Sequence, residues 1–285
     1  MKLYIKQLFI FVFFVSCNNA KALEPLVVQG FPDDPRFSLT LLKEAIKRGN
    51  KYEILYYDEI NGTEVSENKL REEVLNRKVD VFWTLTSAAL EEEFSAVLVP
   101  IYRGMTGMRI ALVRHDRTEM FKNVKTISDL TPFKAGQGTT WADTGILKHN
   151  NLQVITTLKY LNLFPMLEGG RFDYFPRGLP EPWGEMEREN QYNLAVEPYL
   201  LFKYVAPLYY FTHHENLAVH KHITDNLEAM VADGTFGKMF FEDADIKAAL
   251  SKANVKQRII IPLDNPGVTK ATPLNRKELW FDPTQ

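Results

Sequence analysis

The chain has almost no cysteine. Cys17 is the only one among its 285 residues, and it lies close to the N-terminus. If the segment that contains it is removed on export, the mature chain has no thiol. That would exclude disulfide bonds, thiolate metal sites and cysteine nucleophiles.

A hydrophobic segment long enough to cross a bilayer is also lacking. The apolar run near the N-terminus extends only from Leu8 to Val15, whereas a spanning helix needs about 20 such residues. Lys2 and Lys6 precede the run, and Ala20-Lys21-Ala22 follows it. This is the pattern of a cleaved secretory signal, so we predict a signal peptide over residues 1–22.

Two cleavage sites compete within this segment. Cleavage after Ala22 gives a mature protein that starts at Leu23 and is free in the periplasm. The alternative uses Phe14-Val15-Ser16-Cys17 as a lipobox, which would attach the mature protein to a lipid through Cys17. In neither case is the chain an integral membrane protein.

Runs of basic residues are missing as well. Of the 34 Lys and Arg residues, three lie in the predicted signal, which contains none of the 36 Asp and Glu residues. The mature chain therefore has 31 basic and 36 acidic residues and a net charge of −5, with both signs interspersed. Nucleic acid is excluded as a partner on this ground, and we expect a monomer.

Signatures of catalysis are absent too. The sequence has no G-x-S-x-G, no G-x-x-x-x-G-K-[ST] and no H-E-x-x-H, and no pair of carboxylates stands out by its spacing. His213-His214 and His220-x-His222 lack an acid or cysteine that would complete a metal site. We therefore expect a protein that is not an enzyme, with no cofactor and no metal.

Strands and helices alternate along the mature chain. The spacing of apolar residues predicts strands over 26–29, 52–57, 79–83 and 108–113, with helices over 35–48, 69–76 and 87–94. A second series follows, with strands over 153–156 and 172–175, a helix over 160–168 that Pro165 delays, and a helix over 217–230. This alternation predicts an α/β fold with mixed, mainly parallel sheets flanked by helices.

The order of elements predicts two lobes joined by two crossings. We place the crossings near 110–116 and 204–210, which gives a discontinuous first lobe, 23–113 plus 208–285, and a second lobe, 114–207. The tail after Ile259 contains four prolines and is expected to lie extended over a surface.

Two glycine-rich segments in the second lobe are the best candidates for a ligand cleft. In GQGTTWADTG, residues 136–145, a glycine turn leads into a helix with Thr140 as its N-cap and Asp143 three residues later. Free N–H groups at such a helix start, near Thr139 and Thr140, suit an anion, although plain capping is an equal alternative. In GGRFDYFPRG, residues 169–178, a buried strand ends on Arg177.

These features resemble the periplasmic solute-binding proteins of family 3, which include the amino-acid receptors of ABC transporters. The resemblance rests on the secretory signal, the two crossings, Gly138-Thr139-Thr140, Gly170-Arg171-Phe172-Asp173 and Ala232-Asp233-Gly234-Thr235-Phe236. It implies a type II periplasmic-binding-protein fold, a two-lobed clamshell that closes on a small solute.

The resemblance breaks down at the positions that recognise the ligand. Where the amino-acid receptors have an arginine for the ligand carboxylate, this sequence has Glu91-Glu92-Glu93, which would repel an anion. Where they have an aspartate for the ligand amine, it has Arg177 nearby. An ordinary α-amino acid is therefore not the expected ligand, and Arg177 would hold an anionic group. Its alternative role is a structural ion pair with Glu181 or Glu185.

Other candidate contacts lie at ends of predicted strands and helices. Trp83 and Trp141 would stack on the ligand, and either could instead pack within its lobe. Arg103 precedes the first crossing, whereas Arg109 is expected to brace it. The complete set of predicted ligand-binding residues is Arg177, Thr139, Thr140, Trp141, Trp83, Thr84, Thr86, Asp143 and Arg103.

The sequence thus predicts a periplasmic receptor that closes on a small polar or anionic solute and delivers it to an ABC-type permease. One alternative is a ligand-sensing partner of a membrane signalling receptor. A periplasmic lyase or dehydratase on the same scaffold is the other.

Overall fold

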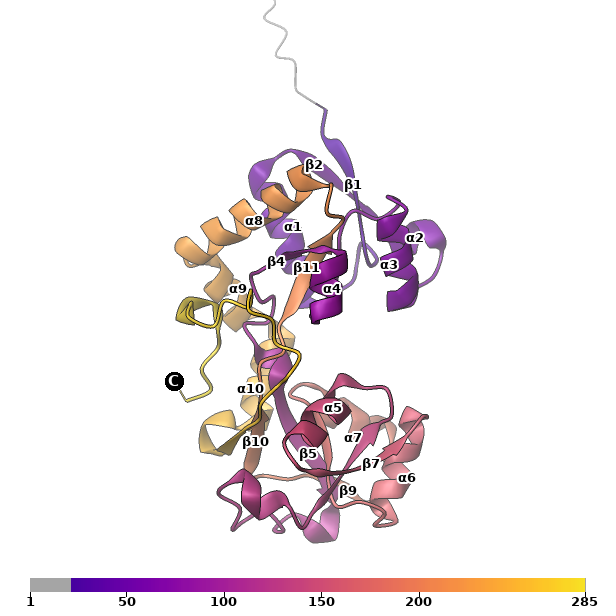
Figure 1. Ribbon diagram of the computed structural model, residues 1–285, viewed down its shortest axis with the longest axis vertical. Helices are drawn as coiled ribbons and strands as arrows, with labels where there is room; N and C mark the ends of the chain where they lie inside the picture. Colours follow the sequence, from indigo (N-terminus) through magenta and orange to yellow (C-terminus); the bar gives the residue numbers. More distant parts are fainter. Residues whose placement is uncertain (1–21, 285) are drawn as a thin grey trace, which may run out of the picture.

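The computed structural model describes residues 22–284, so residues 1–21 of the predicted signal, Cys17 among them, lie outside the described residues. No helix between residues 22 and 284 is long and apolar enough to cross a bilayer. Two α/β lobes are stacked along the long axis, and the end of the chain runs along one side of the region between them (Figure 1).

The first lobe is built on strands in the order β2, β1, β3, β11, β4. β1 and β2 are parallel, a parallel bridge from Val28 to Val81 joins β1 to the segment before β3, and β11 is antiparallel to β3 and β4. The strands are β1 (Glu24–Val28), β2 (Tyr52–Tyr56), β3 (Phe82–Leu85), β4 (Ser95–Val97) and β11 (Leu208–Thr212). The helices are α1 (Phe37–Gly49), α2 (Tyr57–Asn61), α3 (Glu67–Leu75), α4 (Ala88–Glu93), α8 (Leu217–Ala232) and α9 (Thr235–Glu242).

α1 shows why these helices form where the sequence predicts them. Phe37, Leu41, Leu42, Ala45 and Ile46 recur at helical spacing, and all five side chains are buried against the sheet and α8. The helix ends where the next residue, an asparagine, adopts the left-handed conformation.

The second lobe has a mixed sheet with β5 at its centre. β5 is antiparallel to β8, β9 and β10, β12 is parallel to β10, and a parallel bridge from Ala135 to Tyr174 joins the β6–β7 pair to the segment before β8. The strands are β5 (Met108–Arg114), β6 (Lys134–Gly138), β7 (Gln153–Thr157), β8 (Phe175–Gly178), β9 (Leu194–Val196), β10 (Leu200–Lys203) and β12 (Ile259–Pro262). The helices are α5 (Ala142–His149), α6 (Leu163–Glu168) and α7 (Glu181–Arg188), while α10 (Ala244–Ala253) follows α9 and packs between the two lobes.

The chain passes between the lobes four times. The first passage precedes β5, which already pairs within the second sheet, so Met108–Arg114 is not the last strand of the first lobe as the sequence suggested. The second passage lies between β10 and β11. The third and fourth were not foreseen: β12 joins the second sheet, and the tail then returns to the first lobe, where the indole of Trp280 lies against Gly104.

A buried ion pair fixes the third passage. Nη1 of Arg258 donates to the carboxylate of Glu197 at 2.9 Å and to the backbone oxygen of Leu200 at 2.9 Å, while its Nε donates to the backbone oxygen of Ala253. The Glu197 and Arg258 side chains are 0% and 5% exposed. Because a pair this deeply buried is costly to break, the end of α10 and β12 are held firmly on the second lobe.

Candidate functional site

A cavity of about 630 Å³ lies between the two lobes. Its walls come from both lobes and from α10, which packs between them. Lining residues from the first lobe and the first passage are Arg36, Phe37, Leu85, Tyr102, Met105, Thr106 and Leu208. Those from the second lobe are Arg109, Gly178, Leu179, Pro180, Glu181, Trp183, Gly184 and Glu187, and α10 contributes Asp245, Ile246, Ala248, Ala249 and Lys252, preceded by its N-cap Asp243.

The cavity wall contains the aromatic rings of Phe37, Tyr102 and Trp183, and it carries charges of both signs. Its three basic residues are Arg36, Arg109 and Lys252, and its four acidic ones are Glu181, Glu187, Asp243 and Asp245. Arg36 is paired with Asp34 at 2.5 Å, and the ammonium of Lys252 lies 6.0 Å from the ring of Trp183. The wall therefore has no surplus of positive charge.

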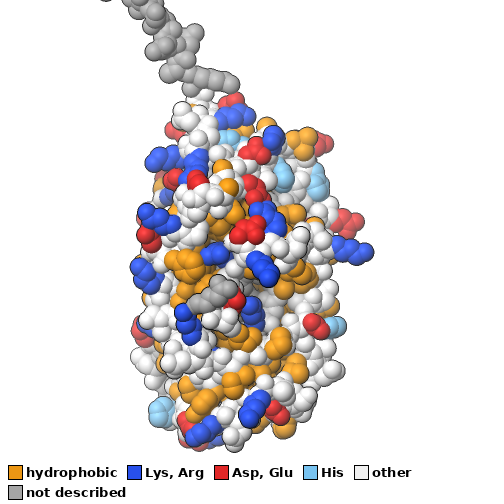
Figure 2. Space-filling view, turned by 90° about the vertical axis from the view of Figure 1, so that its left-hand side faces the viewer, with side chains coloured by type: hydrophobic (Ala, Val, Ile, Leu, Met, Phe, Trp, Pro, Cys, Tyr) orange, Lys and Arg blue, Asp and Glu red, His pale blue; other side chains and the backbone are white. Residues whose placement is uncertain are grey.

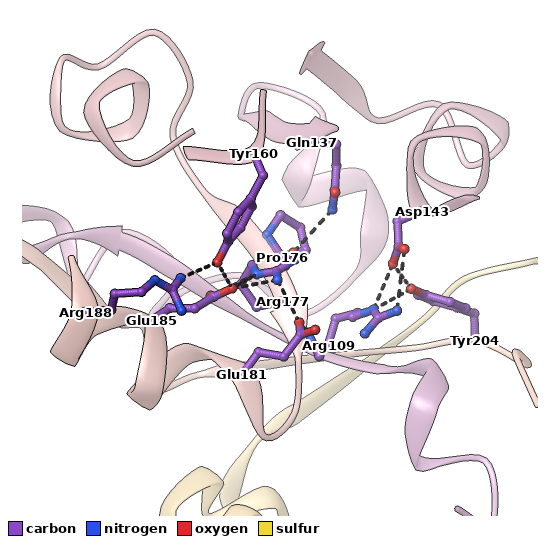
Figure 3. A network of polar contacts seen from close by, with 11 residues as sticks. Arg109, Gln137, Asp143, Tyr160, Pro176, Arg177, Glu181, Glu185, Arg188 and Tyr204 are labelled. Atoms are coloured by element: carbon purple, nitrogen blue, oxygen red, sulfur yellow. Dashed lines mark hydrogen bonds and ion pairs between the residues drawn. The ribbon is translucent and has the colours of Figure 1, made fainter. Parts of the chain in front are cut away.

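Arg177 is held by acidic residues of α7. Its Nη2 lies 2.6 Å from Glu185 and 3.1 Å from Glu181, and its Nε also donates to the Glu185 carboxylate (Figure 3). The side chains of Arg177 and Glu185 are 12% and 5% exposed. The ion pair that the sequence offered as the alternative role of Arg177 is thus present.

Aromatic rings surround the Arg177 guanidinium. It lies 4.8 Å from the ring of Phe175, 5.1 Å from that of Trp141 and 5.5 Å from that of Tyr160. Burial lowers the pKa of Arg177, but the hydrogen bonds and charges of Glu185 and Glu181 outweigh it, so the pKa lies above its ordinary value. The group is therefore always cationic and already compensated.

The same network reaches outward through Tyr160. Its hydroxyl donates to Glu185 at 2.5 Å and accepts from Nη2 of Arg188 at 2.7 Å (Figure 3). Burial and the Glu185 carboxylate raise the pKa of Tyr160 to about 12. Trp141, Tyr160, Arg177, Gly184 and Arg188 line a second, more open hollow of about 490 Å³ beside the cavity.

Asp143 does not cap its helix with Thr140. α5 begins at Ala142 with Trp141 as its N-cap, and no side chain makes the cap hydrogen bond. Instead, the Asp143 carboxylate accepts from Nε of Arg109 at 2.8 Å and from the hydroxyl of Tyr204 (Figure 3). Burial raises the pKa of Asp143, but the charge of Arg109 and the hydrogen bonds of both partners outweigh it and place the pKa below its ordinary value.

Gly136 and Gly138 lie in strand β6, not in a turn. A Cβ at Gly136 would come within 2.2 Å of the ring of Phe172, and one at Gly138 within 2.5 Å of the indole of Trp141. Thr139 and Thr140 follow in an exposed turn and do not line the cavity. The glycines are needed because aromatic rings pack directly on the backbone.

The first-lobe candidates are largely occupied within that lobe. Trp83 is 6% exposed and packs in the core against Tyr210, so it does not reach the cavity. The hydroxyl of Thr84 donates to Glu67 at 2.8 Å, and that of Thr86 donates to Glu91 at 2.6 Å. The acidic stretch that replaces the expected arginine thus binds its own neighbours.

Arg103 lies outside the cavity, on another side of the first passage. Its Nη2 donates to the backbone oxygen of Glu278 in the tail at 3.1 Å, and its guanidinium lies 5.4 Å from the ring of Phe241. Among the predicted residues, the structure brings Arg177 and Trp141 together, places Asp143 beside Arg109 and leaves Arg103 apart.

Tyr102, Trp183 and α10 contribute to the cavity although they were not among the residues predicted from the sequence. A signal for α10 was present: Asp243 accepts from the N–H groups of Asp245 and Ile246, and apolar residues follow at helical spacing. Nothing in the sequence indicated that this helix would lie between the lobes.

No protein-family model and no curated protein matches the sequence. Solved structures do match the fold. A probable amino-acid ABC transporter extracellular-binding protein from Bacillus subtilis aligns with a TM-score of 0.58 at 15% identity, over 79% of this chain and 100% of that one. The chain has the two-lobed fold of the periplasmic solute-binding proteins.

Two further matches were solved with a ligand. An amino acid ABC transporter substrate-binding protein from Streptococcus pneumoniae, bound to L-arginine, has a TM-score of 0.51 at 16% identity over 79% of this chain and 95% of that one. An ancestral arginine-binding protein bound to arginine has a TM-score of 0.51 at 15% identity, over 77% of this chain and 98% of that one. The type II clamshell expected from the sequence is confirmed at the level of the fold.

Proposed function

We propose that the protein is an extracytoplasmic receptor that binds a small polar solute in the cavity between its lobes. The observation that carries this proposal is the cavity itself, about 630 Å³ in volume, whose wall is shared by both lobes and α10. Its size is in the range of ligand sites. The likeness of the fold to binding proteins supports the same function.

The wall favours a solute of low net charge over a strongly anionic one. Arg109 in the wall is neutralised by Asp143, and Arg177, which lines the neighbouring hollow rather than the cavity, is neutralised by Glu185. A ligand anion would have to compete with Glu185 or Asp143 for these guanidinium groups. Phe37, Tyr102 and Trp183 would pack against the apolar part of the solute.

Delivery to an ABC-type permease is the finer part of this proposal. Two matched structures are ABC transporter binding proteins, and closure of the lobes would give a permease a surface that the open form lacks. Co-purification with a permease supports transport, whereas co-purification with a membrane sensor supports the signalling alternative.

Thermal unfolding across a panel of solutes tests the binding function. The panel contains neutral polar compounds, amino acids, monoamines and dicarboxylates. A solute at 100 times its Kd stabilises the folded protein by about 2.7 kcal/mol, which is readily measured. We expect at least one neutral or zwitterionic solute to raise the Tm and dicarboxylates to have no effect. A Tm raised only by dicarboxylates would contradict the proposed ligand class.

A further inference from the structure

A further cavity, the hinge pocket, lies where three of the four passages between the lobes meet. It has a volume of about 350 Å³ and shares no lining residue with the inter-lobe cavity. Its wall includes Arg103 and Gly104 from the first passage, Lys203 and Val205 from the second, and Trp280 and Phe281 from the tail. Figure 2 shows the face over which the tail runs, with hydrophobic and basic side chains next to each other midway between the lobes.

The charge of the hinge pocket is unbalanced. Its two charged lining residues, Arg103 and Lys203, are both cations, and no Asp or Glu lines it. In the part of the chain that the structure describes, neither cation forms an ion pair with a carboxylate. Asp282 follows Phe281 but does not line the pocket, and its Oδ1 accepts from the hydroxyl of Thr284 at 2.7 Å.

Arg103 is fixed in place but incompletely satisfied. Its side chain is half-buried, and its Nε is a buried donor with no hydrogen-bond partner among the described residues. Its backbone adopts φ of 51°, and its backbone oxygen accepts from the N–H of Phe281 at 2.7 Å. Burial lowers the pKa of Arg103. A desolvated cation without a counter-charge is unfavourable, so an anion bound here would gain a strong interaction.

The remaining wall is apolar apart from Tyr204, whose hydroxyl donates to Asp143. Met108, Leu263, Leu274 and the rings of Trp280 and Phe281 surround the two cations. We propose that the hinge pocket binds a small organic anion, with its carboxylate or phosphate oxygens at Arg103 and Lys203 and a flat apolar body against Trp280 and Phe281. This site does not depend on the solute that the inter-lobe cavity takes.

Titration with benzoate, followed by calorimetry, tests the proposal. Benzyl alcohol has a similar body without the charge, so it serves as the matched control ligand. We expect Arg103→Gln to weaken benzoate binding about tenfold, because a hydrogen bond to a charged group is lost, and Lys203→Gln to weaken it severalfold. Lys256→Gln removes an exposed charge outside the pocket and should leave the affinity unchanged.

Circular dichroism establishes whether each variant is folded. If Arg103→Gln does not fold, the benzoate affinity of Lys203→Gln decides the test. The proposal would be overturned if the wild type and the decisive variant bound benzoate with equal affinity. It would also be overturned if the wild type bound benzoate and benzyl alcohol equally well. Anomalous scattering from crystals soaked in 4-bromobenzoate locates the probe. Bromine between Trp280 and Arg103 supports the site, whereas bromine only in the inter-lobe cavity, or nowhere, counts against it.

Discussion

Glu185 holds the guanidinium of Arg177 at 2.6 Å, and both side chains are almost completely buried. The arginine that departs most clearly from the pattern of amino-acid receptors is therefore tied to a carboxylate of its own lobe. Arg177 therefore has a structural role. A ligand could bind its guanidinium only by competing with Glu185.

Breaking the Arg177–Glu185 pair should destabilise the second lobe. We expect Arg177→Met and Glu185→Gln each to lower the unfolding free energy by about 3 kcal/mol, because each leaves a buried charge without its partner. The double variant should lose less than the sum of the two. Urea unfolding measures all four proteins, and strictly additive losses would show that the pair does not couple.

Asp143 should make stability depend on pH in the acid range. Its pKa is lowered in the folded protein, so its contribution is present above its unfolded pKa and is lost as the pH falls through the folded value. At pH 7 we expect Asp143→Asn to cost about 2 kcal/mol, since Arg109 loses a charged partner. This cost should begin to shrink below about pH 4, where Asp143 of the unfolded wild type takes up a proton while the folded protein still holds the carboxylate ionised.

Asp116→Asn is the matched control for that experiment. Asp116 pairs with Arg114 at the surface, where solvent screens the interaction. The unfolding free energies of wild type, Asp143→Asn and Asp116→Asn are measured between pH 3 and pH 7. The cost of Asp143→Asn should change with pH more than the cost of Asp116→Asn. A cost for Asp143→Asn that stays constant over this range would refute its assigned role.

Two glycines of the same segment should respond in opposite directions to alanine. Gly136→Ala forces a Cβ against the ring of Phe172, so we expect a loss of about 1–3 kcal/mol. Gly145 lies within α5 with no atom near its Cβ position, so Gly145→Ala should gain about 0.5–1 kcal/mol from helix propensity. Thermal unfolding of both variants checks the signs, and a stabilised Gly136→Ala would contradict the packing described for β6.

The alternation of strands and helices was predictable because local apolar spacing determines it. α1 and α8 lie close to their predicted bounds, and Pro165 delays α6 to Leu163 as expected. The strand predicted at 172–175 is observed at Phe175–Gly178, because its pairing with β5 fixes the register. That pairing joins residues far apart in the sequence, so no local pattern reveals it.

The candidate site was predictable only in part. The sequence named Glu181 and Glu185 as alternative partners of Arg177, whereas the structure pairs it with both, because α7 turns back on β8. The position of Trp83 also depends on tertiary packing. The sequence pattern places it near a strand end, but it packs against Tyr210 and therefore lies in the core. The third passage, β12 and the position of α10 depend on the buried pair of Glu197 and Arg258, which are far apart in the sequence.

The central claim is that a solute binds in the cavity between the lobes, and filling this cavity tests it most directly. Gly184 lines the cavity from α7, and a Cβ there would meet no atom, so Gly184→Trp should fill the space without disturbing the fold. Gly145→Trp places the same side chain on another exposed helix position, away from the cavity, and is the matched control.

The experiment has two readouts. Mass spectrometry identifies small molecules released from the three purified mature proteins, and thermal unfolding measures the shift that each solute of the panel produces. We expect wild type and Gly145→Trp to retain and respond to the same solute, whereas Gly184→Trp should do neither. Equal release and equal thermal shifts in Gly184→Trp would contradict the assignment of the inter-lobe cavity as the solute site.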